Sequence, residues 1–241
     1  MRDKLDTLLS MDTETIPNLT ADNLKDYENK LISKINSSKK YTDKTKKTKT
    51  DKIKTRMMEF KSGIRDTEFG RELIHTFSKD PLNNIVVAVG LTYEDNDGVE
   101  ISTAKASKNE KELMEWFVDT VSDIQDKMKN DGDLIWGTHY GIFDFRSLRL
   151  ALIRNNVSVD KIKLKRDTLF PIKKYSDFVI DSCDMMECKL DELSKAVLGE
   201  GKINNGSKVY EMFMNNEIDE IQKYVLDDAQ KTFRNIIKIY I

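Results

Sequence analysis

A run of nine residues from Ile85 to Tyr93 constrains the fold more than any other part of the sequence. It reads Ile-Val-Val-Ala-Val-Gly-Leu-Thr-Tyr, and its β-branched and apolar side chains are typical of a buried strand. The following Asp95-Asn-Asp-Gly98 predicts a hairpin turn, and Val99 to Ala104 then predicts an antiparallel partner strand. The chain is therefore expected to build a sheet around an antiparallel pair.

Further strands and helices are predicted on both sides of this hairpin. Short apolar runs predict a first strand at Leu8 to Met11, a fourth at Asp133 to Gly137 and a last at Val179 and Ile180. Apolar residues that recur at the helical period predict helices at Glu110 to Met128, from Asp144 onward, at Leu190 to Val197 and at Ile218 to Ile239. The expected fold is α/β, a mixed sheet with helices packed on it.

Residues 21–78 differ from the rest of the chain in composition. They are rich in Lys, Asp, Thr and Asn, and they read as a charged, helical insertion after the first strand. Since 241 residues suit one domain with an elaboration, we expect a single domain over 1–241 with this insertion inside it. Within the insertion, residues 39–54 hold eight lysines against two aspartates. They fit either a surface that follows a phosphate backbone or a solvated lysine-rich helix or loop.

Charge and cysteine content bound the function only loosely. The formal net charge of −2 neither favours nor excludes a nucleic-acid partner. Cys183 and Cys188 have no nearby histidine and match no zinc pattern or disulfide framework, so reduced thiols in a cytoplasmic protein are predicted. The longest apolar stretch, Ile85 to Val89, is too short to cross a bilayer, and no membrane association is expected.

An acidic pair follows the first predicted strand. Alternate residues of a strand point the same way, so Asp12 and Glu14 can face one metal cluster. The tripeptide Asp-Thr-Glu is weak evidence alone, because residues 66–68 repeat it. The second copy lacks a preceding strand and reads as the solvated start of a helix, so the first copy is the candidate.

A second pair lies near the end of the chain. Tyr224 and Asp228 fall in a clear helical pattern, where a spacing of four places both side chains on one face, about 6 Å apart. The same Tyr-x-x-x-Asp spacing also occurs at Tyr93 with Asp97 and at Tyr140 with Asp144. Taken alone, the pair is better interpreted as a tyrosine on a partly buried face beside a solvated aspartate.

A third motif changes this interpretation. Gly137-Thr-His-Tyr-Gly-Ile-Phe-Asp144 follows a strand and opens a helix, a place where backbone can approach a ligand and a carboxylate can lie at the edge of a sheet. Three ordered acidic motifs from distant parts of the chain are what a two-metal phosphodiester-cleaving site needs.

The three motifs, in this order, resemble those of the DEDD, or DnaQ-like, family of 3′–5′ exonucleases in its tyrosine subclass. The chain is most similar to the exonuclease domain of family B DNA polymerases and its stand-alone relatives, over residues 8–20 and roughly 79–240. The matching stretches are Met11 to Thr15, Gly137 to Asp144 and Tyr224 to Thr232, with supporting similarity at Lys79 to Val89, at Leu190 to Gly199 and at Gly201-Lys202. The histidine subclass would place histidine at Lys223, so the resemblance is to the tyrosine subclass.

The resemblance implies a ribonuclease H-like fold and a metal-dependent exonuclease. Its substrate would be the 3′ end of a nucleic acid, with single-stranded DNA favoured over RNA, and its products nucleoside 5′-monophosphates. Two divalent cations, Mg²⁺ or Mn²⁺, would be held by Asp12, Glu14, Asp144 and Asp228, and Tyr224 would orient the attacking water. Substrate contacts are implied for Thr13, His139 and Phe143. The sequence identifies no polymerase or other replication or repair partner.

One position departs from the family pattern. His139 stands where the second motif usually carries asparagine, so a substrate contact and a structural histidine are both open for it. Two other functions compete with the exonuclease: a non-cleaving nucleic-acid-binding or accessory module on the same fold, and a charged α/β interaction protein. The four carboxylates and the tyrosine argue against the first, and the order of the motifs argues against the second.

Overall fold

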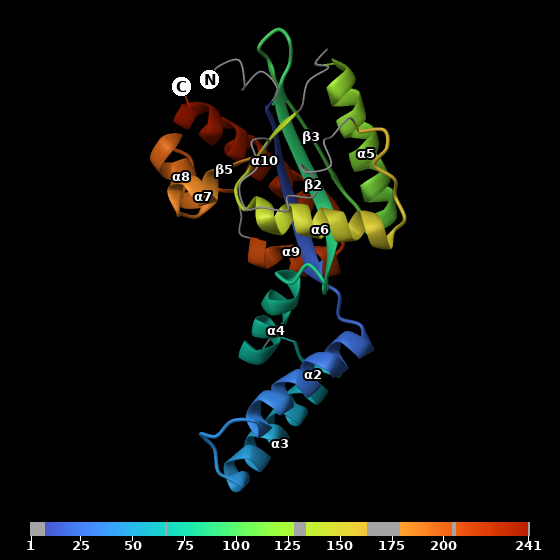
Figure 1. Cartoon of the computed structure of the whole chain (residues 1–241), viewed down its shortest axis with the longest axis vertical. Coiled ribbons are helices and arrows are strands. Elements are labelled where there is room, and N and C mark those ends of the chain that lie inside the picture. Colours follow the sequence, from blue (N-terminus) through green and yellow to red (C-terminus); the bar gives the residue numbers. More distant parts are fainter. Residues whose placement is uncertain (1–7, 66, 128–133, 163–178, 204–205, 241) are drawn as a thin grey trace. The chain divides into compact units, whose positions relative to one another are not determined.

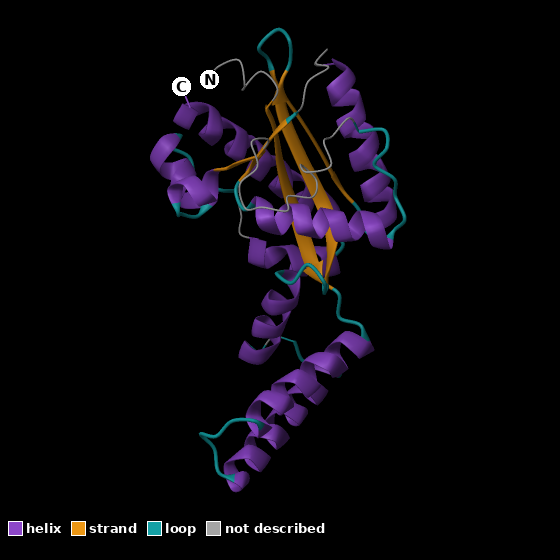
Figure 2. Cartoon of the chain, viewed as in Figure 1, coloured by secondary structure: helices purple, strands orange, loops and turns teal. Residues whose placement is uncertain are grey.

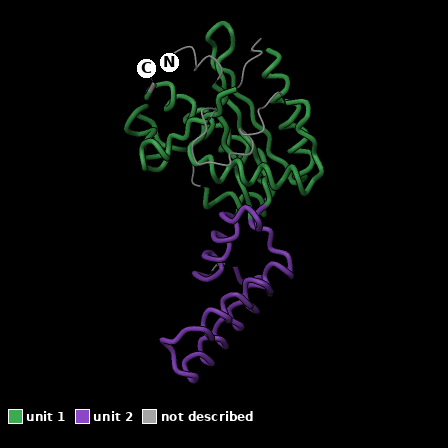
Figure 3. Tube along the Cα trace, in the orientation of Figure 1, with its two compact units in different colours: residues 1–16, 85–241 green, residues 17–84 purple. Residues whose placement is uncertain are grey.

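The computed structural model describes residues 8–65, 67–127, 134–162, 179–203 and 206–240, and the chain divides into two compact units (Figure 3). Unit 1 comprises residues 1–16 and 85–241, and unit 2 comprises residues 17–84. Figure 3 colours unit 1 green and unit 2 purple.

Unit 1 is built on a mixed five-stranded sheet (Figure 2). The strands are β1 (Leu8–Pro17), β2 (Asn84–Glu94), β3 (Glu100–Ala106), β4 (Ile135–Thr138) and β5 (Val179–Asp181), in the spatial order β3-β2-β1-β4-β5. The hairpin β2–β3 is antiparallel, whereas β4 runs parallel to both β1 and β5. This sheet, flanked by helices, is the predicted ribonuclease H-like α/β fold.

Helices cover both faces of the sheet (Figure 1). Leu9 and Met11 of β1 pack in one core with α5 (Glu110–Lys127) and α6 (Gly141–Arg154). Leu8 and Ile16 face the opposite way and pack with residues of α10 (Ile218–Tyr240). The remaining elements of unit 1 are α7 (Ser182–Met186), α8 (Leu190–Val197), η1 (Gly206–Lys208) and α9 (Val209–Met214). The alternation along β1 therefore decides which side chains reach α10.

Most predicted elements are confirmed, and among the boundaries that differ three bear on the site. β1 does not end at Met11 but continues to Pro17, because Thr13, Thr15 and Ile16 remain buried in strand geometry. The helix predicted from Asp144 begins at Gly141, whose amide donates a 2.7 Å hydrogen bond to an Asp181 carboxylate oxygen. The strand predicted from Asp133 begins at Ile135, while Asp133 lies outside the described residues.

Unit 2 confirms the helical prediction for the insertion. Its helices are α2 (Ala21–Asn36), α3 (Asp43–Lys61) and α4 (Glu68–Ser78), each with a threonine side chain that accepts a hydrogen bond at its N-terminus. They share a small apolar core of Leu24, Met57, Phe60, Leu73 and Phe77. The interpretation of Asp66 as a helix start falls outside the described residues, and α4 begins at Glu68.

Two smaller predictions concern the cysteines and the membrane. Cys183 and Cys188 are not joined by a disulfide. Among the described helices, none combines the length and the apolar character that crossing a bilayer requires.

Candidate active site

Two carboxylates of β1 point toward α10. Asp12 and Glu14 lie on the face of the strand that also carries Ser10, whose hydroxyl donates a 3.0 Å hydrogen bond to the backbone carbonyl of Ala229 in α10. Thr13 lies between the two carboxylates and points to the other face. The side chains of the Asp-Thr-Glu motif therefore point to opposite faces of the sheet, with Asp12 and Glu14 on one face and Thr13 on the other.

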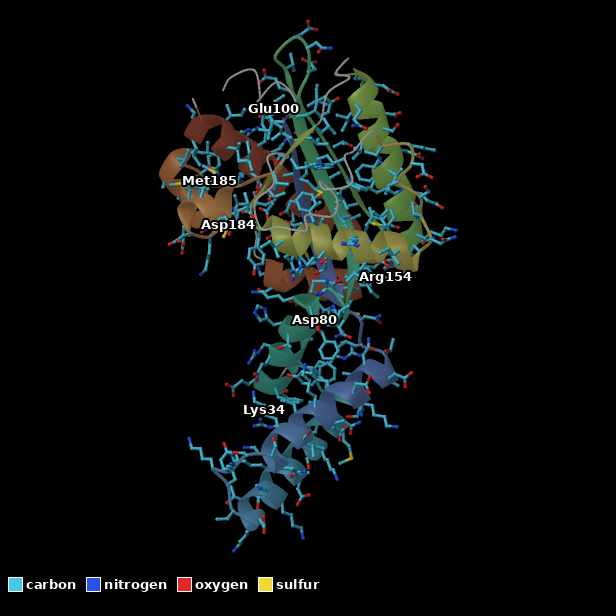
Figure 4. The ribbon with its side chains drawn as sticks, viewed as in Figure 1. Lys34, Asp80, Glu100, Arg154, Asp184 and Met185 are labelled. Atoms are coloured by element: carbon cyan, nitrogen blue, oxygen red, sulfur yellow. The ribbon has the colours of Figure 1, made fainter. Side chains whose placement is uncertain are left out.

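Close packing holds α10 against the sheet at this level. A side chain at Gly90 of β2 would bring its Cβ within 2.5 Å of the Val225 carbonyl oxygen, so glycine is required for this approach. Farther along α10, Arg234 forms two 2.9 Å hydrogen bonds with Glu100 of β3 (Glu100 is labelled in Figure 4). These contacts fix the helix that carries Tyr224 and Asp228.

Three carboxylates form the centre of the site. Ligand oxygens of Asp12, Glu14 and Asp228 all lie within 4.8 Å of one another. Asp228 is 1% exposed, and the other two are partly exposed. Burial raises the pKa of Asp12 and of Glu14 well above the usual range, and repulsion by neighbouring carboxylates, above all Asp228, adds to it. The pKa of Asp228 rises to about 6, also through burial, although Lys202 opposes the rise.

Asp144 is held beside this cluster by Thr13. The Thr13 hydroxyl donates a 2.6 Å hydrogen bond to Asp144 Oδ1, and both residues are buried. Burial raises the pKa of Asp144 to about 7, with further repulsion from Asp181 and Asp228, against the stabilising hydrogen bonds from Thr13. Asp144 also raises the pKa of Asp12 electrostatically. Asp144, the fourth predicted carboxylate, thus interacts electrostatically with the cluster, and its side chain comes from α6.

Lys202 is a site residue that was missing from the sequence prediction. It follows α8 in a loop in which its backbone amide donates a 2.9 Å hydrogen bond to Asp191. Its ammonium forms an ion pair with Asp228 and lies 4.9 Å from the ring centre of Tyr224. Burial lowers the pKa of Lys202, but the carboxylates of Asp228, Asp12 and Glu14 together outweigh burial and raise it. The ammonium neutralises part of the negative charge of the cluster.

Tyr224 completes the α10 contribution. The residue is 1% exposed, and its phenol is hydrogen-bonded to the Asp228 carboxylate. Burial, then repulsion by Glu14 and Asp228, raises the phenol pKa far above its usual range. Tyr224 therefore stays a neutral phenol at any physiological pH, which suits it to hydrogen bonding rather than to proton abstraction.

The remaining predicted residues flank the site. His139 Nδ1 lies 2.8 Å from the hydroxyl oxygen of the buried Ser182, and burial, then the charge of Lys202, lowers its pKa to about 4. The imidazole is neutral at pH 7. Phe143 is half-buried and stacks on the exposed ring of Tyr140, with 6.2 Å between the ring centres.

The chemistry of the cluster fits a divalent cation. All the donors are carboxylate oxygens, the set that Mg²⁺ and Mn²⁺ prefer over the nitrogen and sulfur ligands typical of zinc. Asp12 Oδ2 and Asp228 Oδ1 are buried oxygens without a hydrogen-bond partner among the described residues. Unsatisfied anionic oxygens, raised pKa values and a lysine ammonium among the carboxylates are what a cation site shows in its metal-free form.

Comparison with known proteins gives the chain a family. A search of curated proteins found no match. A protein family described as "predicted 3′-5′ exonuclease related to the exonuclease domain of PolB" matches residues 75–240. This match includes Asp144, Lys202, Tyr224 and Asp228, while Asp12 and Glu14 lie before it. The chain belongs to this family of predicted 3′–5′ exonucleases related to the exonuclease domain of PolB.

Proposed function

We propose that the protein is a metal-dependent 3′–5′ exonuclease of the tyrosine subclass. It hydrolyses phosphodiester bonds at the 3′ end of a nucleic acid and releases nucleoside 5′-monophosphates. Single-stranded DNA is the favoured substrate, and RNA is the second candidate. The catalytic residues are Asp12, Glu14, Asp144, Tyr224 and Asp228.

One observation carries this proposal. Carboxylates from β1 and from the far end of the chain meet within 4.8 Å, in a setting that leaves two of their oxygens unsatisfied. Such an arrangement destabilises the metal-free protein through repulsion, and it is relieved when cations bind. Because the carboxylate cluster destabilises the metal-free protein, its presence is better explained by a function than by a contribution to stability.

The carboxylates are expected to hold two divalent cations, Mg²⁺ or Mn²⁺. Bound cations supply Lewis acidity, which lowers the pKa of a water and stabilises the departing 3′ oxygen. Asp12, Glu14 and Asp228 are the central ligands. Asp144 would be the fourth ligand. The Thr13 hydroxyl fixes its orientation, as residues that hydrogen-bond to metal ligands commonly do.

Tyr224 orients the attacking water in this scheme. Because its phenol is neutral and hydrogen-bonded to Asp228, it can share a water with that carboxylate without taking its proton. The exposed Tyr140 and its neighbour Phe143 offer aromatic surface on which a terminal base can stack. The neutral His139 remains a predicted contact to phosphate or sugar, and Thr13 remains a predicted substrate contact.

A cleavage assay with a matched pair of variants tests the proposal. The protein is incubated with 5′-labelled single-stranded DNA or RNA in Mg²⁺, Mn²⁺ or EDTA. Glu14→Gln should lose activity by orders of magnitude, whereas Glu68→Gln, in the second Asp-Thr-Glu copy, should match the parent because Glu68 is exposed on α4. The sugar of the shortened substrate identifies the preferred nucleic acid.

The expected result is a ladder that shortens from the 3′ end and depends on the metal. Intact substrates in every lane, while the protein still binds them, would instead support the non-cleaving binding module. Full activity of Glu14→Gln would remove the carboxylate cluster from the mechanism.

A further inference from the structure

The basic charge of the chain is concentrated in one segment of unit 2. Residues 17–84 contain sixteen Lys and Arg against ten Asp and Glu, a formal charge of +6, although the whole chain carries −2. The segment 39–54 has eight lysines and two aspartates, so it accounts for the whole excess. The rest of unit 2 is neutral, which makes this segment a local feature rather than a general bias.

Residues 43–54 of this segment form the first part of α3, and this part of the helix has no apolar face. Thr42 caps the helix, with its hydroxyl oxygen accepting a hydrogen bond from the Thr45 amide. The buried residues of α3, Met57 and Phe60, both lie near its C-terminal end. Between residues 43 and 56 the one apolar side chain is Ile53, which is half-buried against the unit 2 core. The exposed face of this part is therefore entirely polar.

Four lysines dominate that exposed face. We call Lys44, Lys47, Lys52 and Lys54 the basic surface, because all four are exposed and none forms an ion pair with a residue that the structure describes. Two threonines beside these lysines, Thr48 and Thr55, donate their hydroxyl hydrogens to backbone carbonyls of the same helix and not to the lysine side chains. The ammonium groups of the basic surface face solvent.

The neighbouring helix α2 differs from α3 in how its charges are distributed, and it is typical of a solvent-exposed helix. Its lysines are interspersed with Asp22, Asp26 and Glu28, and Glu28 forms a 3.2 Å ion pair with Lys61. In α3, by contrast, three pairs of lysines are three positions apart, a spacing that places like charges side by side and weakens the helix; they are Lys44 and Lys47, Lys46 and Lys49, and Lys49 and Lys52. Figure 4 shows the side chains of this helix pair, with Lys34 of α2 labelled.

The chemistry of the basic surface decides between kinds of partner. A protein interface needs an apolar centre, and a helix that lies on a membrane needs an apolar face, but residues 43–56 offer neither. Lys46, Lys47 and Lys54 line an open hollow of about 540 Å³ together with Asp43 and Asp51. With both aspartates counted, the segment still carries six positive charges in excess, which a flexible chain of phosphates can follow.

We propose that the basic surface of α3 binds the phosphate backbone of single-stranded nucleic acid. This is a binding site separate from the carboxylate cluster, and most of unit 2 lies before the residues that the exonuclease family matches. Binding is electrostatic and independent of sequence. It does not require cleavage, so it can be tested independently of the catalytic proposal.

The salt dependence of binding tests this site. Affinity for a fluorescent single-stranded 20-mer of DNA or RNA is measured by anisotropy, in EDTA, over a range of NaCl concentrations. The slope of log affinity against log salt should become shallower by about 0.7 for each lysine that contacts phosphate, and by up to about 3 for Lys44→Gln/Lys47→Gln/Lys52→Gln/Lys54→Gln. The matched control replaces Lys25, Lys30, Lys34 and Lys79, which are exposed residues of unit 2 outside the segment.

The control and the four-arginine variant of the basic surface should both keep the parent slope. The arginine variant retains the charge, so it also separates loss of binding from loss of folding. An unchanged slope in the glutamine variant, or an equal fall in the control, would overturn the proposal. Competition by poly-glutamate as effective as that by unlabelled DNA would reassign the surface to an acidic protein partner.

Discussion

The Lys202 ammonium forms an ion pair with Asp228, one of the three carboxylates at the centre of the site. The same ammonium is attracted by Asp12 and Glu14, and its side chain is only 20% exposed. A single positive charge thus stands among ligands that suit a divalent cation. We therefore expect Lys202 to stabilise the metal-free protein and to compete with a bound cation for Asp228.

Replacing Lys202 by methionine should therefore change stability and metal affinity in opposite directions. The metal-free protein should lose about 3 kcal/mol at pH 8, because the removal of one partner leaves buried carboxylates uncompensated. Mn²⁺ affinity, measured by calorimetry, should rise because the competing charge is gone. Lys195→Met is the matched control, since Lys195 forms an exposed ion pair with Asp191. Unchanged or weaker Mn²⁺ binding in Lys202→Met would show that the ammonium does not compete.

The raised carboxylate pKa values predict an unusual pH dependence. Asp144, with a pKa of about 7, and Asp228, with one of about 6, hold protons in the folded state that they release near pH 4 when unfolded. Between pH 4 and 7 these carboxylates bind more protons in the folded protein than in the unfolded chain. Together with Asp12 and Glu14 they outweigh His139, whose lowered pKa acts in the opposite direction, so the free energy of unfolding falls as pH rises. The metal-free protein should be more stable at pH 5 than at pH 8.

Thermal melts at pH 5 to 8, with EDTA or with Mg²⁺, measure this effect. Because cations bind the ionised carboxylates, the increase in Tm caused by Mg²⁺ should grow over the same range of pH. Asp144→Asn keeps an oxygen that can accept the Thr13 hydrogen bond, and it should flatten the pH dependence. A melting temperature in EDTA that rises from pH 5 to pH 8 would contradict the assigned protonation states.

Local signals predicted most of the fold, while the site depends on contacts that no local signal marks. The hairpin β2–β3 and the helix α10 follow from a turn cluster and a helical period. The prediction for β1 stopped at Met11 because the polar residues beyond it do not look like a central strand, yet their side chains form the site. The partners Thr13 and Asp144 are 131 positions apart.

Lys202 illustrates the same limit. It is one of forty basic residues, and only the return of the chain after α8 places it beside Asp228. Family similarity at Gly201-Lys202 indicated that the stretch matters, but it did not assign the ammonium to the carboxylate cluster. Such a role follows from the tertiary structure alone.

Tyr224→Phe should slow cleavage less than the loss of a carboxylate. The change removes the hydroxyl that is hydrogen-bonded to Asp228 but leaves every metal ligand in place. We expect a rate that falls by about tenfold to a hundredfold, at or below the low end of what a positioned proton-transfer group contributes, because Tyr224 orients the water without taking its proton. Mn²⁺ affinity should be unchanged. Tyr93→Phe is the control, because Tyr93 is also buried but lies in the core with α5. A loss of cleavage rate as large as that of Glu14→Gln would show that Tyr224 does more than orient the attacking water.

The single-domain prediction can be tested by excising the insertion. The strands β1 and β2 are neighbours in the sheet, and unit 2 is the connection between them. At its two ends, the Asn18 amide donates a 2.8 Å hydrogen bond to the Asn83 carbonyl, so the chain leaves and returns at one place. A short glycine linker can therefore replace residues 19–82 without stretching either strand.

The excised protein should fold and keep its stabilisation by Mg²⁺, since Asp12, Glu14, Asp144 and Asp228 all belong to unit 1. Its binding of single-stranded DNA in EDTA should lose the salt dependence that the basic surface supplies, matching the four-glutamine variant. Circular dichroism and melting with and without Mg²⁺ measure the first expectation, and anisotropy measures the second. A folded product without Mg²⁺ stabilisation would mean that the carboxylate cluster needs the insertion, which would then be an integral part of the catalytic domain rather than an elaboration of it.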